Sequence, residues 1–418
     1  MTRQTDDSGQ PFQVMAKPSG PVCNLACTYC FYRHKTRWLH TSRGFTMDRE
    51  ILDVFVHRYI ASQPDGCPVQ FVWQGGEPTL CGIDFFRHAL NLQERYRRPG
   101  QTITNAFQTN AVLIDEEWAV FLKDHDFLVG VSIDGPADIH DHYRKDAAGT
   151  GSFDRVITAL GHLKRYDVPC NALCCVTDIS EKDPLRIYDF LREHFEFIQF
   201  IPVVQERNFT RQAPFIRDEK KTPGTQKKKA KDLVTFWSVS PNGWGKFLTT
   251  IFDEWVLRDV GRTFVQIFDA TLACTLGHPA PLCIFERTCG RALVMEHDGD
   301  IYSCDHFVYP SHKLANIREH GPEDSADSKK QVRFGQDKFK RLPKQCLRCE
   351  YLVLCCGECP KNRFLNTKKG EKELNYLCAG YRDYFSHTTR AMAFMANELK
   401  HQRPAANVMD LAGKLIKS

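Results

Sequence analysis

The chain has 418 residues, of which 42% are hydrophobic and 26% are charged, and its net charge is +5 at pH 7. This length suffices for one large globular domain and a smaller one, and so modest a charge argues neither for nor against nucleic-acid binding. No apolar run is long enough to span a membrane, and the polar segment from Met1 to Gln10 lacks the apolar core of a secretory signal. We therefore expect a cytoplasmic protein.

Short apolar runs alternate with helical patterns over the first two-thirds of the chain. The predicted strands are Phe12 to Ala16, Val69 to Trp73, Thr102 to Gln108, Phe127 to Ile133, Cys170 to Val176 and Phe197 to Val203. The predicted helices are Phe85 to Tyr96, Glu116 to Lys123, Phe153 to Tyr166 and Leu185 to Phe195. This alternation indicates an α/β fold, a barrel or an open sheet, in which ligands bind at the C-terminal ends of parallel strands.

Two polar segments interrupt the pattern. The segment 211–232 contains six lysines, and the segment 319–330 is acidic and then basic. Both are predicted as loops, the first as a mobile insertion, for which a basic nucleic-acid patch is the alternative. Near Leu272 the sequence becomes rich in cysteines and turns, so we expect an α/β domain at 12–271, a small metal-organised domain at 272–385 and a helical tail at 386–418.

Cys23, Cys27 and Cys30 form the pattern C-x3-C-x2-C directly after the first predicted strand. Three thiolates so close together can hold three corners of a 4Fe–4S cube and leave the fourth iron open to a small molecule. A structural zinc site, with His34 as a fourth ligand, is the alternative. A cytosolic protein does not normally use its cysteines for disulfides, so these 18 cysteines favour metal or cluster ligation.

Eight later cysteines make a second group with regular spacings: Cys283, Cys289, Cys304, Cys346, Cys349, Cys355, Cys359 and Cys378. Eight thiolates complete two four-ligand sites, and two zinc sites would satisfy that count as well as two clusters. The other seven cysteines are interpreted as buried core thiols: Cys67, Cys81, Cys170, Cys174, Cys175, Cys274 and Cys356. Asp305 directly follows Cys304 and is predicted to take a proton from a substrate, with His306 as the alternative base.

In combination, these motifs resemble the radical S-adenosylmethionine (SAM) enzymes that carry a SPASM domain, and among them the anaerobic sulfatase-maturating enzymes. The resemblance covers roughly residues 12 to 385. It rests on Lys17-Pro18, the C-x3-C-x2-C run, Phe71 to Leu80 (FVWQGGEPTL), Gln108-Thr109-Asn110, Gly130 to Pro136 and Cys304-Asp305. It implies a partial (β/α)6 radical SAM barrel at 12–271 and a SPASM domain at 272–385.

The resemblance also implies roles for individual residues. Cys23, Cys27 and Cys30 would hold the 4Fe–4S cluster that binds SAM, and the eight later cysteines would hold two auxiliary 4Fe–4S clusters. The implied SAM contacts are Tyr29, Gly75, Gly76, Glu77, Pro78, Ser132, Arg144 and Val204. For Ser132 and Val204, ordinary strand packing is the alternative. Tyr32 and Gln74 would face the peptide substrate, and Asp305 would remove its proton.

The implied reaction converts a cysteine or serine of a sulfatase polypeptide to Cα-formylglycine without oxygen. The partners would be an unfolded sulfatase with a C/S-x-P-x-R motif and a low-potential reductant such as flavodoxin or ferredoxin, with no nucleic acid and no membrane. A radical from SAM would take a β-hydrogen, and an auxiliary cluster would accept the second electron. The alternatives are a SPASM-type maturase of another ribosomal peptide and a non-catalytic zinc-binding adaptor.

Overall fold

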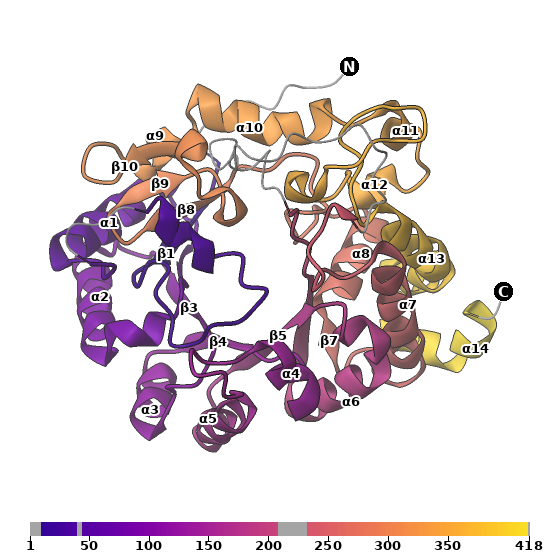
Figure 1. Cartoon of the computed structure of the whole chain (residues 1–418), viewed down its shortest axis with the longest axis horizontal. Coiled ribbons are helices and arrows are strands. Elements are labelled where there is room, and N and C mark those ends of the chain that lie inside the picture. Colours follow the sequence, from indigo (N-terminus) through magenta and orange to yellow (C-terminus); the bar gives the residue numbers. More distant parts are fainter. Residues whose placement is uncertain (1–9, 40–43, 208–231, 417–418) are drawn as a thin grey trace. The chain divides into compact units, whose positions relative to one another are not determined.

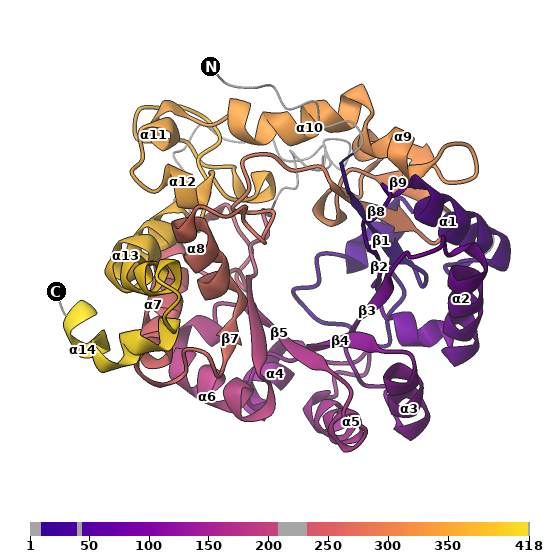
Figure 2. The same cartoon turned by 180° about the vertical axis from the view of Figure 1, so that it is seen from behind.

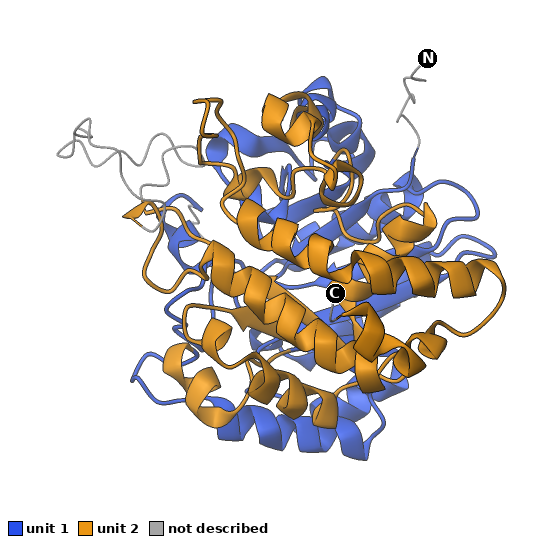
Figure 3. Ribbon diagram, turned by 90° about the vertical axis from the view of Figure 1, so that its right-hand side faces the viewer, with its two compact units in different colours: residues 1–131, 144–170, 289–336 blue, residues 132–143, 171–288, 337–418 orange. Residues whose placement is uncertain are grey.

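The computed structural model describes residues 10–39, 44–207 and 232–416 (Figure 1). The chain divides into two compact units (Figure 3). The first unit comprises 1–131, 144–170 and 289–336, and the second comprises 132–143, 171–288 and 337–418. Residues 211–231 of the lysine-rich segment lie outside the described residues, so their predicted loop stays a prediction. None of the described helices is both long enough and apolar enough to cross a lipid bilayer.

The first unit is organised around strands in the order β10-β9-β8-β1-β2-β3-β4. Their bounds are β1 (Gln13–Lys17), β2 (Val69–Trp73), β3 (Ile103–Thr109), β4 (Phe127–Ser132), β8 (Ala292–Glu296), β9 (Asp300–Tyr302) and β10 (Lys313–Asn316). Neighbours from β1 to β4 pair in parallel, and β8 pairs in parallel with the other edge of β1. Strands β9 and β10 continue the sheet antiparallel to their neighbours. The parallel order places the ends of β1, β2 and β3 at one edge.

Helices connect these strands and cover the sheet. They are α1 (Arg49–Ser62), α2 (Ile83–Tyr96), α3 (Glu116–Asp124), α5 (Phe153–Arg165), α9 (Pro322–Ala326) and most of α10 (Lys329–Lys340). Figures 1 and 2 show α1 and α2 side by side along the outer face of β1–β3. Phe55 of α1 and Phe86 of α2 are fully buried there against Trp73 of β2. The aromatic side chains thus form the core beneath the strand ends.

The second unit contains the parallel strands β5 (Cys170–Val176), β6 (Phe197–Pro202) and β7 (Phe264–Val265). Its helices are α4 (Ala137–Tyr143), α6 (Pro184–His194), α7 (Pro241–Arg258), α8 (Gln266–Leu276), α11 (Lys344–Leu347), α12 (Leu352–Cys355), α13 (Cys378–Lys400) and α14 (Ala412–Leu415). Helices α7 and α13 pack closely because glycines meet at their crossing: a Cβ on Gly245 would come within 2.8 Å of the Gly380 Cα. The long helix α13 is thereby fixed, and Cys378 begins it.

Short 3-10 helices occupy several connections: Arg33–Arg37, Pro78–Cys81, Ser180–Lys182, Asp305–Phe307, Pro310–His312, Pro360–Asn362 and Ala405–Asp410. The six predicted strands correspond to β1–β6, and the four predicted helices to α2, α3, α5 and α6, with ends that differ by at most two residues. These ten predictions are confirmed, because apolar periodicity dominates each segment.

Two predictions about the C-terminal third are wrong. The segment 319–330, predicted as a loop, contains α9 and the start of α10. Helix α9 begins with Pro322 in its first turn, and the Asp324 carboxylate accepts a hydrogen bond from the Gly321 amide at 3.2 Å. The helical tail, predicted at 386–418, starts earlier than expected: its long helix begins at Cys378, because Tyr381, Tyr384 and Phe385 are buried along it. The predicted domain limits stay predictions.

Candidate active site

The cysteine triad lies in the loop that follows β1, beside the loop that follows β2. The Gly76 amide donates to the Gly20 carbonyl at 2.7 Å, and the Glu77 amide donates to the Val22 carbonyl at 2.9 Å. A Cβ on Gly76 would lie 1.9 Å from the Val22 carbonyl oxygen, so only glycine permits this approach. The Gly-Gly-Glu-Pro loop therefore fixes the chain immediately before Cys23.

Glu77 is fully buried and connects this loop to the end of β3. Its carboxylate accepts hydrogen bonds from the Thr79 amide (3.1 Å) and hydroxyl (2.8 Å), the Thr109 hydroxyl (2.7 Å) and the Asn110 amide (2.8 Å). Burial raises the pKa of Glu77, and these hydrogen bonds oppose the rise. Glu77 thus anchors three segments, and its predicted contact with SAM stays a prediction.

Asn110 continues this network to the first cysteine. Its side-chain amide donates to the Asn24 side-chain oxygen at 2.7 Å and to the Cys23 sulfur at 3.5 Å. The Cys23 sulfur also accepts from the Leu25 amide at 3.3 Å. Burial raises the pKa of Cys23 to about 11, so a thiolate there needs a compensating cation. Three partly exposed thiols with amide donors to sulfur fit an iron–sulfur cluster.

The other residues predicted to contact SAM fall in both units. In the first unit, the Arg144 guanidinium lies 5.5 Å from the centre of the Tyr29 ring, and both side chains are buried. Gly75 and Pro78 flank Gly76 and Glu77 in the loop after β2. Ser132, at the end of β4, and Val204, a buried residue that follows β6, belong to the second unit. Their predicted roles stay predictions.

Four polar residues gather around Lys17 at the C-terminal end of β1. The Lys17 ammonium forms an ion pair with Asp305 and donates a hydrogen bond to the Gln74 side-chain oxygen at 2.9 Å. It also lies 3.8 Å from the centre of the Tyr32 ring, whose hydroxyl donates to Glu296. The structure therefore brings together Tyr32, Gln74 and Asp305, which the resemblance assigned to substrate and proton removal.

Asp305 is suited to remain a carboxylate. Burial acts to raise its pKa, but the charges of Lys17, His306 and Lys35 outweigh that effect and hold the pKa below its usual range. The side chain keeps 21% of its surface exposed, whereas Lys17 keeps 1%. Part of the Asp305 side chain is therefore accessible, and its predicted role as a base stays a prediction. The alternative base, His306, packs its ring edge-on against Phe31 at 5.4 Å.

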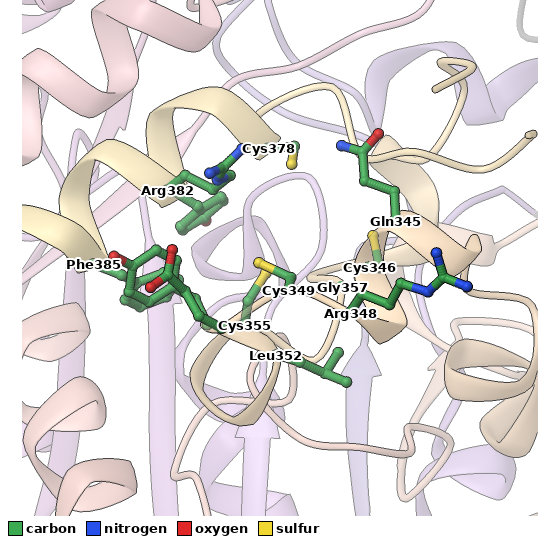
Figure 4. Close-up of a pocket in the computed structure, with 13 residues that line it drawn as sticks. Gln345, Cys346, Arg348, Cys349, Leu352, Cys355, Gly357, Cys378, Arg382 and Phe385 are labelled. Atoms are coloured by element: carbon green, nitrogen blue, oxygen red, sulfur yellow. The ribbon is translucent and has the colours of Figure 1, made fainter. Parts of the chain in front are cut away.

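The second unit holds the other well-defined cysteine site. Cys346, Cys349, Cys355 and Cys378 line one cavity of about 260 Å³, which Arg348, Arg382, Tyr381 and Phe385 also line. Figure 4 shows the four cysteines around this space. Burial raises the pKa of Cys346 to about 11 and also raises that of Cys355 and Cys378. Four thiols around a cavity fit a complete cluster, with no position left for a small molecule.

A single zinc ion would need sulfurs about 4 Å apart, given Zn–S bonds of about 2.3 Å. Within the described ranges, no three His, Cys, Asp or Glu side chains are grouped closely enough to hold one ion. The remaining predicted ligands are divided between the units: Cys283 and Cys359 lie in the second, and Cys289 and Cys304 in the first. Their assignment as cluster ligands stays a prediction. Among the seven predicted core thiols, Cys174 and Cys356 are buried, while the other five are partly exposed.

Sequence reasoning missed three buried polar residues near these sites: Glu296, Lys35 and Arg363. Lys35 donates to the Val308 carbonyl at 3.0 Å, and Glu296 accepts from Tyr32. Arg363 donates to four backbone carbonyls. A single charged residue in a sequence is normally predicted to lie at the surface, and only the fold shows that these three side chains are buried.

Two segments of the chain match known protein families, and these matches define the class of this protein. Residues 18–191 match the radical SAM superfamily, and residues 283–350 match the SPASM family, described as an iron–sulfur cluster-binding domain. The chain is therefore a radical SAM enzyme with a SPASM domain, and these regions bind SAM and 4Fe–4S clusters. The predicted α/β fold class is confirmed, and the zinc-binding adaptor is excluded.

Full-length relatives define the family. A serine-type anaerobic sulfatase-maturating enzyme from Bacteroides thetaiotaomicron is 45% identical over 96% of this chain and 95% of its own. A cysteine-type enzyme from Clostridium perfringens (strain 13 / Type A) is 32% identical over 93% of this chain and all of its own. A solved structure, native anSMEcpe with bound AdoMet and Cp18Cys peptide, superposes with a TM-score of 0.79 at 32% identity and covers 93% of this chain and 99% of that chain. This chain belongs to the anaerobic sulfatase-maturating enzymes.

Proposed function

We propose that this chain oxidises a serine in a sulfatase polypeptide to Cα-formylglycine without oxygen. Family membership supports the reaction. For the residue, the support is the 45% identity to the serine-type enzyme from Bacteroides thetaiotaomicron, against 34% to a serine-type enzyme from Klebsiella aerogenes and 32% to the cysteine-type enzyme from Clostridium perfringens. The observation that carries the proposal is the placement of Asp305, an accessible carboxylate paired with Lys17 and following a predicted cluster ligand. A base at this position can take the proton of a hydroxyl that is being oxidised.

Different residues of this chain have different roles in the proposed reaction. Cys23, Cys27 and Cys30 would hold the SAM-binding 4Fe–4S cluster, and the eight later cysteines would hold two auxiliary clusters. When bound, SAM and its cluster supply a radical that removes one hydrogen from the substrate β-carbon. Converting a serine side chain to an aldehyde then requires loss of the hydroxyl proton and of one electron. Asp305 would accept the proton, since its charge is maintained by Lys17. The electron would pass to an auxiliary cluster held by the later cysteines.

Tyr32 and Gln74 would orient the peptide. Both contact Lys17, as Asp305 does, so the three side chains are held around one point. Structures of anSMEcpe contain the Cp18Cys and Kp18Cys peptides. For this chain we propose an unfolded sulfatase segment with an S-x-P-x-R motif and a low-potential reductant such as flavodoxin. The cytoplasmic location of this chain stays a prediction.

Paired peptides test this proposal. The anaerobically reconstituted protein is incubated with SAM, a reductant and peptides that differ only in S-x-P-x-R or C-x-P-x-R, and the products are analysed by mass spectrometry. We expect the serine peptide to lose two hydrogens and to react with an aldehyde-specific hydrazine. Asp305→Asn should form 5′-deoxyadenosine and yield little aldehyde. Conversion of the cysteine peptide alone, or of neither peptide while SAM is cleaved, would contradict the proposal.

A further inference from the structure

We propose that Lys17 is a positioning residue of the reaction, whose ammonium aligns Asp305 and Gln74 with the substrate. This inference rests on the proposed function, because it takes Asp305 as the base. Lys17 is the last residue of β1, and its side chain is 1% exposed. Burying an ammonium is unfavourable unless close partners compensate. The contacts of the Lys17 ammonium therefore explain how it can be buried here.

The partners of Lys17 come from three different connections of the first unit. Asp305 begins the 3-10 helix after β9, Gln74 directly follows β2, and Tyr32 follows the cysteine triad. A lysine ammonium offers three donors on a compact head, so it can contact an anion, an amide oxygen and an aromatic face together. Lys17 forms these three contacts, with Asp305, Gln74 and the Tyr32 ring. One cation thus joins segments that are distant in sequence.

The pairing of strands β1 and β8 fixes the positions of Lys17 and Glu296 in this cluster. Lys17 and Glu296 are directly paired in the parallel register of β1 and β8. Glu296 is fully buried, and its carboxylate accepts a hydrogen bond from the Tyr32 hydroxyl. The Tyr32 ring is therefore held by Glu296 at its hydroxyl and by Lys17 at its face. The position of the ammonium follows from strand register, which side-chain motion does not readily disturb.

Only Asp305 in this cluster combines charge with exposure. Lys17, Tyr32 and Glu296 are 1%, 3% and 0% exposed, whereas 21% of the Asp305 side chain is accessible. The ion pair with the buried ammonium restrains the carboxylate while part of it faces outward. Loss of the ammonium would free Asp305 and Gln74 to adopt other rotamers. A displacement of about 1 Å can lower a rate by about 100-fold.

Lys35 provides a matched control within the same unit. It is also fully buried, donates to the Val308 carbonyl at 3.0 Å and lies 3.4 Å from the centre of the Tyr309 ring. It therefore resembles Lys17 in burial and in its aromatic contact. Its backbone amide donates to the Tyr32 carbonyl at 3.0 Å, and its positive charge acts on Asp305. The ion pair with Asp305 and the hydrogen bond to Gln74 are formed by Lys17. Lys35→Met therefore removes a buried ammonium from the same region and leaves these two contacts of Lys17 in place.

The test compares Lys17→Met, Lys17→Gln and Lys35→Met with the wild type, all as full-length, anaerobically reconstituted enzymes. The readouts are iron content, peptide-independent SAM cleavage, and the number of 5′-deoxyadenosine molecules formed per aldehyde in the serine peptide. We expect both Lys17 variants to form aldehyde about 100-fold more slowly than the wild type, and to lose much less of their peptide-independent SAM cleavage. Their ratio of 5′-deoxyadenosine to aldehyde should therefore rise, and that of Lys35→Met should rise much less.

Lys17→Gln keeps a side-chain NH₂ group that can donate hydrogen bonds, and it is therefore used if Lys17→Met does not fold. An iron-loaded Lys17→Gln enzyme with the wild-type ratio would overturn the proposal, as would an equal rise in Lys35→Met. The wild type separates this inference from the proposed function. If the wild type converts no peptide, the proposed function fails. If the wild type converts the peptide and the Lys17 variants keep its ratio of 5′-deoxyadenosine to aldehyde, only the role of Lys17 fails.

Discussion

The cysteine triad of the first unit and the cysteine cavity of the second unit hold their sulfurs in different ways. The triad lies in a loop whose approach is fixed by backbone pairing to the Gly-Gly-Glu-Pro loop. The cavity is lined by cysteines from the short helices α11 and α12, from the segment between them and from the start of α13. Three sulfurs leave one iron of a cube open, and four complete it. The number of thiols, combined with the neighbouring loop, is thus the basis on which we propose a site for chemistry at the triad and a site for electron transfer at the cavity.

Each site is supported by one buried charged side chain. Glu77 accepts hydrogen bonds from four groups beside the triad. Arg363, beside the cavity, donates to the carbonyls of Cys356 (3.1 Å), Gly357 (2.8 Å) and Glu358 (2.8 Å), and also to Lys338. These three consecutive residues have φ values of 45°, 75° and 54°, a left-handed conformation that is costly outside glycine. Arg363 therefore stabilises the turn between the predicted ligands Cys355 and Cys359.

Substituting Glu77 should disrupt the cysteine triad without disrupting the cysteine cavity, and substituting Arg363 should do the reverse. Glu77→Ala leaves four buried donors without their acceptor, and Arg363→Met leaves buried carbonyls unpaired, so each should lower the free energy of unfolding by about 3 kcal/mol or more. We expect Glu77→Ala to lose SAM cleavage and to keep most of its auxiliary-cluster iron. Arg363→Met should lose auxiliary iron and still cleave SAM.

Thermal unfolding, iron analysis and 5′-deoxyadenosine formation measure these effects. Glu77→Gln and Arg363→Lys are the conservative controls, and each should retain more of its site than the larger change. Loss of SAM cleavage in Arg363→Met, with unchanged iron, would show that the two regions are not independent.

A smaller, pH-dependent effect is expected at the helix pair that carries Cys378. His387 of α13 contacts Asp253 of α7, with 2.5 Å between the ring Nε2 and a carboxylate oxygen. The hydrogen bond to Asp253 raises the pKa of His387, and partial burial opposes it. A raised pKa in the folded state means that the stabilisation is complete below about pH 6.5, the unfolded value. It is lost as the pH rises through the folded pKa.

The pair is partly exposed, so its contribution should be below about 1 kcal/mol. Unfolding in urea at pH 5.5 and pH 8.5 should show this difference in the wild type. His387→Gln and Asp253→Asn should both remove it. An unchanged pH dependence in both variants would place its origin elsewhere.

The sequence predicts local structure and ligand types better than it predicts the surroundings of the ligands. Strands β1–β6 follow from apolar runs, and the triad follows from its spacing. Helix α10 was missed in part because its residues are largely polar, and its start lies in a segment of mixed charge. The contact of Lys17 with Asp305 depends on the register of β1 against β8, which are almost 280 residues apart in sequence. No local pattern encodes such a pairing, so the motif Lys17-Pro18 was visible while its function was not.

The most direct test compares Cys23→Ala/Cys27→Ala/Cys30→Ala with Cys346→Ala/Cys349→Ala in SAM cleavage and iron content. Each variant should retain about two-thirds of the iron of a three-cluster enzyme. We predict that the triad variant forms no 5′-deoxyadenosine, and that the cavity variant still forms it but yields no aldehyde in the serine peptide. SAM cleavage that survives in the triad variant and disappears in the cavity variant would contradict the assignment of the open site to Cys23, Cys27 and Cys30.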